Sequence, residues 1–346
     1  MQLINQLPQP TWHHLGVNEA DSRIPAVSWK EALSAPTITF SLPESTCVPD
    51  AQFTEGGLGS VWERELFHTA SPHTYVLDNA SGNPLEIHVT LSDEGLTPMA
   101  LDLHGLSGSE TTIYEIVEGK GEYAGLTRMV ADKHAKVHLV QVHMPDMQSR
   151  IWSSVAVSLA EEAEVSVTRI ELGATSIVAG VRSTLNHPRS VFNMGALYLG
   201  RGHDLLDFND VADHIAPDTH SEMRTVGVLD DMASKILRGT IDFKRGSVHA
   251  VGYESEDVLV FGEKVRNRTA PLILCAEERV EGQHAASIGR INEDELYYCK
   301  ARGMSEAQAR ELLAFAKLRP VLDRIPDANL HDRLLTAIEE RLKNHA

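Results

Sequence analysis

One histidine stands among small and polar residues in VEGQHAASIGRIN, residues 280–292. His284 follows a run of alternating apolar positions and precedes a segment with helical periodicity. A neutral imidazole nitrogen is a common ligand for iron, copper and zinc. A lone histidine is more often a packed side chain that hydrogen-bonds the backbone. The residue types therefore leave two interpretations open, a ligand at a reactive site and a structural imidazole.

Four aspartates recur at every third position in HDLLDFNDVADH, residues 203–214: Asp204, Asp207, Asp210 and Asp213. Carboxylates in this number could bind a hard cation or act as a pair in acid–base chemistry. A calcium-type site also needs a defined turn and converging carbonyl oxygens. The segment shows neither pattern, so the sequence favours a solvated loop over a cation site.

The cysteines are few and far apart. Cys47, Cys275 and Cys299 form no C-x-x-C pair, which argues against a disulfide framework and against a zinc or iron–sulfur site built by this chain alone. Cys275 and Cys299 lie in the apolar or aromatic settings LILCAEE and LYYCKAR. We predict that both thiols are buried in the core.

Signatures of common enzymes are missing from the sequence. It contains no G-x-x-x-x-G-K-[ST], no G-x-S-x-G and no H-E-x-x-H, and GGLGS at 56–60 lacks the lysine of a phosphate-binding loop. His138 and His143 are five residues apart, so on one strand they point to opposite faces and cannot share a metal. The chain is predicted to be neither an ATPase, a serine hydrolase nor a zinc protease.

The elements that would position these residues are short strands. Between about residues 75 and 292, segments such as LEIHVTL, AKVHLVQVH and EVSVTRIEL alternate apolar and polar positions. Apolar peaks recur at a spacing of roughly 14 to 21 residues, which we interpret as one coil of a solenoid. Few Asn-Gly or Asp-Gly pairs are present to join antiparallel neighbours. The pattern predicts a mainly β protein with a parallel β-helix over residues 71–292.

The two ends of the chain differ from this middle part. Residues 1–70 mix helix-compatible and proline-punctuated segments, and residues 293–346 read as helices broken at Pro320 and Pro326. Ser305 and Gln308 are spaced as a capping box. Apolar residues lie on one face of each C-terminal helix and could pack on the solenoid or on another protein; they are Ala309, Leu312, Leu313 and Ala316, then Leu330, Leu334, Leu335, Ile338 and Leu342. Packing within the chain is the simpler interpretation.

Composition restricts the partners. The 346 residues are 42% hydrophobic, enough to bury a sizeable core, and 49 acidic against 31 basic residues give a net charge of -18. Such a charge disfavours nucleic acid and anionic membranes as partners. The first residues, MQLINQLPQPTWHHLG, lack the basic and apolar regions of a signal peptide. No segment is long and apolar enough for a membrane span, so a cytoplasmic location is expected.

Two long segments resemble a known family. They are VADHIAPDTHSEMRTVGVLDDMASKILRGTIDF, residues 211–243, and PLILCAEERVEGQHAASIGRINEDELYYCKARGMSEAQARELLAFAKLRPVLDRI, residues 271–325. The part QHAASIGRINEDELYYCKARGM is the most specific. It is similar to the SufB/SufD family of iron–sulfur cluster assembly proteins. The resemblance implies a right-handed parallel β-helix flanked by an N-terminal mixed or helical region and a C-terminal α-helical region.

The resemblance also implies partners and a cargo. SufB-like and SufD-like scaffolds form a complex with the SufC ATPase and assemble a transient iron–sulfur cluster, so the ATPase belongs to a separate chain. The C-terminal apolar face, Leu312, Leu313, Ala316 and Leu334, is then a predicted SufC-binding surface. Association of the open solenoid edge with a SufB-like scaffold, or with a second copy as a homodimer, is expected.

The residues around His284 distinguish the two scaffolds. SufB-like members read Cys-Gln-His-Glu where this chain has Gly282, Gln283, His284 and Ala285. The missing thiolate and carboxylate favour a SufD-like member, in which the histidine would be a cluster ligand shared across the interface with SufB. SufD-like members commonly keep a cysteine where this chain has Gly282. Two alternatives stay open: a β-helix carbohydrate lyase or esterase using Asp204 and Asp207, and a purely structural subunit that binds no metal.

Overall fold

A computed structural model of the chain describes residues 4–10, 15–21, 23–27, 29, 37–45, 53–78, 83–93 and 95–343. The strands in this part are β1 Thr37–Phe40, β2 Pro72–Leu77, β3 Leu85–Leu91, β4 Leu96–Gly105, β5 Glu110–Gly119, β6 Glu122–Ala131, β7 Lys136–Pro145, β8 Arg150–Leu159, β9 Glu164–Leu172, β10 Ser176–Leu185, β11 Val191–Gly200, β12 Leu205–His214, β13 His220–Leu229, β14 Ser234–Phe243, β15 Val251–Val260, β16 Arg266–Cys275 and β17 Glu281–Gly289. The helices are α1 Ser60–Thr69, α2 Glu293–Ala301, α3 Glu306–Leu322 and α4 Ala328–Lys343.

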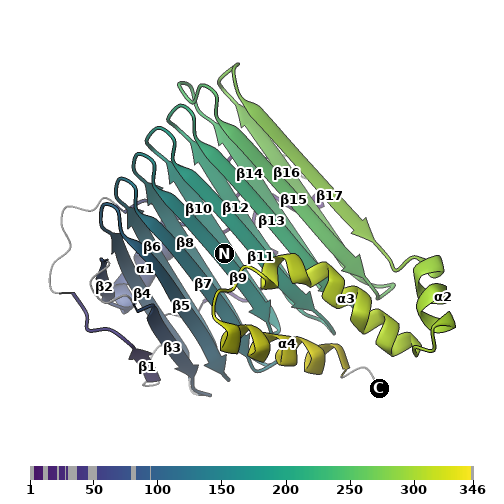
Figure 1. Cartoon of the computed structure of the whole chain (residues 1–346). Helices are drawn as coiled ribbons and strands as arrows, with labels where there is room; N and C mark the ends of the chain where they lie inside the picture. Colours follow the sequence, from purple (N-terminus) through teal and green to yellow (C-terminus); the bar gives the residue numbers. More distant parts are fainter. Residues whose placement is uncertain are drawn as a thin grey trace.

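The strands form two parallel sheets that coil into a solenoid (Figure 1). The nine-strand sheet has the order β1-β3-β5-β7-β9-β11-β13-β15-β17, and the eight-strand sheet has the order β16-β14-β12-β10-β8-β6-β4-β2. From β2 onward, successive strands belong alternately to the two sheets, so each coil contributes one strand to each. Each strand pairs in parallel with the strand one coil away, which confirms the predicted parallel β-helix.

One coil is longer than the sequence pattern indicated. Glu110 pairs with Lys136 and Val251 pairs with Glu281, steps of 26 and 30 residues along the chain. Because strands of both sheets carry the same apolar pattern, each apolar peak marks one strand rather than one coil. The spacing that we interpreted as a coil is therefore about half a coil.

Alternate residues of both sheets point into the lumen between them, because side chains on a strand alternate in direction. Large apolar side chains such as Leu139, Phe192, Phe208 and Phe243 fill this lumen and are at most 1% exposed. Burying a side chain of this size contributes about 1.5–3 kcal/mol relative to leaving it in water. The lumen is thus the main hydrophobic core.

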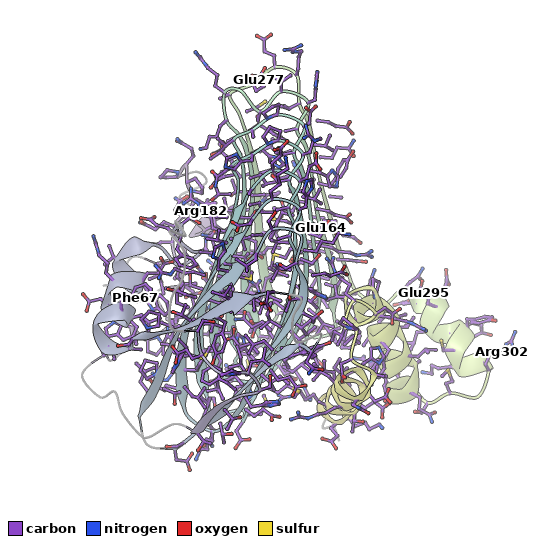
Figure 2. All side chains as sticks on the ribbon, turned by 60° about the vertical axis from the view of Figure 1, so that its left-hand side comes forward. Phe67, Glu164, Arg182, Glu277, Glu295 and Arg302 are labelled. Atoms are coloured by element: carbon purple, nitrogen blue, oxygen red, sulfur yellow. The ribbon has the colours of Figure 1, made fainter. Side chains whose placement is uncertain are left out.

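Helices cover the outer faces of both sheets (Figure 2). Leu318 of α3 and Leu334 of α4 pack on Val142 and Leu197 of the nine-strand sheet. On the other side, Trp62 of α1 packs against the eight-strand sheet. Among the described residues no helix is long and apolar enough to cross a membrane.

The C-terminal helices begin with the predicted cap but do not end where proline suggested. Ser305 and Gln308 make the capping box at the start of α3. Pro320, however, lies inside α3, which continues to Leu322. Proline removes one backbone donor without forcing this last turn open. The actual break lies at Pro326, between α3 and α4.

The two ends of the solenoid are finished differently. At the N-terminal end, β1 pairs antiparallel with β3. At the C-terminal end, β16 and β17 each have a neighbour on one side only, and every residue of β17 is exposed. The described part of the chain thus presents an open edge beside the point where α2 begins.

Candidate functional site at the open end of the solenoid

His284 lies on the exposed edge strand β17, in the last coil. Its register partner on β15 is Glu254. Residues 280–292 contain the last strand and its connection to the helices, because β17 ends at Gly289 and α2 starts at Glu293. The imidazole is therefore accessible to a partner.

The side chain of His284 is on the lumen side of β17. A Cβ atom added to Gly282 would lie 2.8 Å from the Phe243 ring and 3.3 Å from Ile273, and both of these side chains belong to the lumen. Since residues two apart share a face, His284 faces the same way. We call the lumen-facing positions Thr269, Ile273, Cys275, Gly282 and His284 of the last coil the lumen mouth.

A buried polar network lies directly beneath the lumen mouth. Glu256 forms an ion pair with Lys235 and accepts hydrogen bonds from Thr269 at 2.5 Å and from Tyr198 at 3.4 Å. Lys235 also donates to the Thr269 hydroxyl at 3.0 Å. Burial lowers the pKa of Lys235, although Glu256 opposes this shift. The network connects the interior of the lumen to the last coil.

Glu254 is the second carboxyl group beneath the lumen mouth, and it is 7% exposed. Its Oε2 atom has no hydrogen-bond partner among the described residues. Burial raises its pKa to about 8, and the nearby Glu256 and Asp210 add to the shift. The carboxyl group occupies the space that a side chain at Gly239 would need.

The cysteines only partly follow the prediction. Cys299 is buried in α2, as expected. Cys275 is exposed, which corrects the expectation of a core thiol, because LILC belongs to the last coil and no further coil covers it in the part of the chain that the structure describes. Its thiol donates to the backbone carbonyl of Glu277 at 2.9 Å. Cys47 lies outside the described residues.

The four aspartates do not form a solvated loop. They lie on or next to β12, a strand that is almost entirely buried. Three are held in ion pairs with arginines, namely Asp207 with Arg238 at 2.6 Å, Asp210 with Arg169 at 2.9 Å and Asp213 with Arg182 at 2.7 Å. Across the described residues, no three histidine, cysteine or acidic side chains come together as a metal site. The pairing gives no support to a lyase or esterase carboxylate pair.

The histidines of β7 point to opposite faces, as predicted. His138 is half-buried on the outer face and its Nε2 lies 2.9 Å from the Thr168 hydroxyl. Burial and the nearby Arg324 lower its pKa to about 4. His143 is fully buried, with Nδ1 2.9 Å from a Glu171 carboxylate oxygen. Both side chains are structural.

The predicted docking residues divide into two groups. Leu312 is 48% exposed, and Leu313 and Ala316 line a groove of about 460 Å³ between α3 and the edge of the nine-strand sheet. Leu334 is fully buried beneath α4. A partner cannot reach Leu334 without displacing α4, so its apolar position serves packing within the chain.

Sequence reasoning missed two exposed aromatic residues of α2, the helix whose Glu295 lines this groove. Tyr297 and Tyr298 of α2 are 75% and 59% exposed. Their adjacency in DELYYCKA was the available signal, since neighbouring residues of a helix point about 100° apart and two bulky tyrosines rarely fit one narrow buried face. Exposed tyrosines are typical of binding surfaces.

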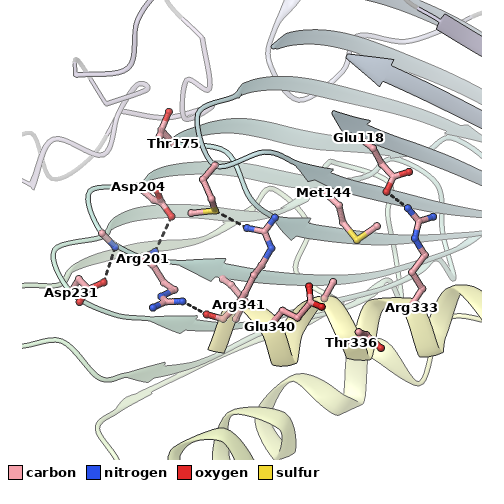
Figure 3. Close-up of a pocket in the computed structure, with 14 residues that line it drawn as sticks. Glu118, Met144, Thr175, Arg201, Asp204, Asp231, Arg333, Thr336, Glu340 and Arg341 are labelled. Atoms are coloured by element: carbon pink, nitrogen blue, oxygen red, sulfur yellow. Dashed lines mark hydrogen bonds and ion pairs between the residues drawn. The ribbon is translucent and has the colours of Figure 1, made fainter. Parts of the chain in front are cut away.

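A second cavity, of about 900 Å³, lies between α4 and the turns of several coils (Figure 3). Asp204 lines it and accepts a hydrogen bond from the Arg201 backbone amide at 2.9 Å. Burial raises the pKa of Asp204 to about 6. No local pattern in the sequence indicates this cavity, because its lining residues come from segments far apart in the chain.

Comparison with known proteins agrees with this architecture. The family model for the SufBD core domain of the SUF system of iron–sulfur cluster assembly matches residues 103–317. SufD of Bacillus subtilis is 30% identical over 145 residues, which are 42% of this chain and 33% of that protein. A SufBD family protein of Mycobacterium leprae is 25% identical over 286 residues, 80% of this chain and 73% of that protein.

SufD of Escherichia coli is 20% identical over 243 residues, which are 69% of this chain and 57% of that protein. The matches thus span about a third of the Bacillus protein and just over half of the Escherichia protein. The family model covers more than half of this chain and includes the strands that carry the buried network. The chain belongs to the SufBD family of iron–sulfur cluster assembly proteins.

Proposed function

We propose that the chain is the SufD-like subunit of an iron–sulfur cluster assembly scaffold, with a SufB-like scaffold and a SufC-like ATPase as partners. Two of the relatives above are named SufD. The segment Gly282, Gln283, His284, Ala285 has no thiol and no carboxylate around its histidine. The expected cytoplasmic location is part of the same proposal.

The observation that carries the proposal is the position of His284. It faces the lumen on an exposed edge strand, so a second β-solenoid that pairs with β17 would bring its own residues next to this imidazole. Iron, and the transient cluster built from it, is the cargo of such a scaffold. A neutral imidazole can bind iron and releases it more readily than thiolate does. His284 would supply one ligand of a shared site.

Docking of the ATPase is assigned to the surface formed by Leu312, Leu313, Ala316, Tyr297 and Tyr298. Tyrosine and leucine side chains that are exposed together can be buried by a partner. We expect Leu312→Asp to weaken binding of the SufC-like ATPase in a pull-down from purified components. The variant Arg319→Asp, at an exposed position of the same helix, is the control. Equal binding by a folded Leu312→Asp variant would contradict this surface.

The ligand role of His284 is tested in the coexpressed complex. After anaerobic reconstitution with iron and sulfide, His284→Ala should give less bound iron and weaker visible absorption than the wild type. Gln283→Ala is the matched control, because Gln283 is the exposed neighbour on the opposite face of β17. An unchanged cluster yield in His284→Ala would favour the purely structural subunit.

A further inference from the structure

Three carboxyl groups lie close together beneath the lumen mouth, and two of them have a cation. Asp210 is paired with Arg169 through two hydrogen bonds of 2.9 and 3.1 Å. Glu256 is paired with Lys235. Glu254 lies within range of both acidic side chains, yet its Oε2 atom has no partner among the described residues. Lys235 also acts on Glu254 from a distance, but the Oε2 atom of this third carboxyl group is left without a hydrogen bond among the described residues.

The next lumen-facing side chain above Glu254 is His284. The two residues are register partners on adjacent parallel strands. Neighbouring strands lie about 4.8 Å apart, and register partners project to the same face of the sheet. The glutamate side chain has three rotatable bonds, so its carboxyl group can turn from the space at Gly239 toward the imidazole. After such a turn, one ion would be within reach of both side chains.

We propose that Glu254 and His284 together bind one divalent transition-metal ion, such as Fe²⁺, at the lumen mouth. A carboxylate oxygen and an imidazole nitrogen are both suitable ligands for such an ion. Binding of the ion displaces the proton of the Glu254 carboxyl group. This inference rests on the proposed ligand role of His284 and adds the second ligand from the same chain.

The arrangement has a consequence for assembly. Two protein ligands hold the ion at the open end of the lumen and leave its other coordination positions free. Sulfide and side chains of a partner solenoid can occupy those positions. His284 and Glu254 would thereby load iron before the partner closes the site.

Metal titration of the full-length chain tests the inference. Co²⁺, added under argon, serves as the probe because its visible absorption reports nitrogen and oxygen ligands, and Fe²⁺ is then used in competition. Glu254→Gln and His284→Ala should each weaken binding about tenfold or more. Glu281→Gln is the matched control, since it removes a carboxylate from the opposite face of β17.

A second variant and a folding measurement keep the test decisive. Glu254→Asp retains the carboxylate but shortens the side chain by one methylene, so it should also bind more weakly. Circular dichroism confirms that each variant is folded before titration. Weaker binding in His284→Ala together with wild-type binding in both Glu254 variants would overturn this inference and leave the role of His284 intact. A wild-type chain that binds no Co²⁺ also overturns it, while the proposed function is judged separately by iron content in the complex.

Discussion

Arg169 and Asp210 form a doubly hydrogen-bonded ion pair that crosses the lumen. Arg169 lies on β9 of the nine-strand sheet and Asp210 on β12 of the eight-strand sheet. The guanidinium group also lies 4.9 Å from the centre of the Phe208 ring. The pair therefore connects the two walls of the solenoid in the middle of an otherwise apolar core.

Removal of one partner of this pair should destabilise the folded chain. Asp210→Ala leaves the buried Arg169 without its counterion and is expected to lower the free energy of unfolding by about 3–5 kcal/mol. The double variant Arg169→Met/Asp210→Leu removes both charges and should lose much less. Urea unfolding of the three proteins measures the difference. Equal losses in the single and double variants would show that the charge itself is unimportant.

Asp204 should make stability fall with rising pH over a defined range. Its pKa is raised from 3.8 to about 6 in the folded chain by burial, against the opposing effect of Arg341 and Arg201 and with a small addition from Asp231. The unfolded chain ionises first as the pH rises, so the folded chain binds more protons between about pH 4 and pH 6. Stability is therefore lost across that range, by up to about 3 kcal/mol.

The variant Asp204→Asn removes this titration, and its side-chain oxygen can still accept from the Arg201 amide. Its free energy of unfolding should fall less than that of the wild type between pH 4 and pH 6, and it should be the more stable protein at pH 7. Glu340→Gln, at another exposed carboxylate of the same cavity, is the control. If the unfolding free energies of wild type and Asp204→Asn changed in parallel with pH, the pH dependence would not come from Asp204.

Leu312 and Leu334 are both predicted docking residues from the sequence, but truncating them should change the free energy of unfolding by different amounts. Leu334→Ala removes a fully buried side chain and is expected to cost about 2–5 kcal/mol of unfolding free energy. Leu312→Ala changes a side chain that is 48% exposed and should stay within about 0.5 kcal/mol of the wild type. Thermal and urea unfolding both report this contrast. Similar losses would mean that α4 is not docked as described.

A thiol placed at Gly282 should not fit without adjustment. The added Cβ would lie 2.8 Å from the Phe243 ring, closer than ordinary contacts. Gly282→Cys is expected to cost about 1–3 kcal/mol through overpacking, and Phe243→Leu in the same chain should recover part of the loss. Ala285→Cys, on the outer face of β17, controls for the cysteine itself. Unchanged stability in Gly282→Cys would show that the ring moves freely.

The alternation of apolar and polar residues in the sequence was enough to locate strands. LEIHVTL and EVSVTRIEL coincide with β3 and β9, because alternation reflects one face toward the lumen and one away from it. The length of one coil could not be predicted in the same way, since strands of both sheets show the same alternation. His284 was located in the last coil because the alternation stops just after it.

The buried charges could not be predicted from local sequence. Asp210 is 41 residues from Arg169 and Asp207 is 31 residues from Arg238, so only the register of distant strands reveals the pairs. Glu254 was missed for the same reason, because its relation to His284 depends on the pairing of β15 with β17. Cys275 was misjudged because apolar neighbours indicate burial only when another coil follows.

The antiparallel strand β1 has a consequence for how many subunits can associate. A solenoid whose two ends both continued the parallel ladder could add further copies head to tail and grow into a filament. Here β1 reverses direction at one end and is only 4 residues long. Among the described residues, the nine-strand sheet has a parallel edge at β17, whereas β2 and β16 both end the eight-strand sheet. The reversal at β1 therefore works against head-to-tail growth of the nine-strand sheet beyond that end.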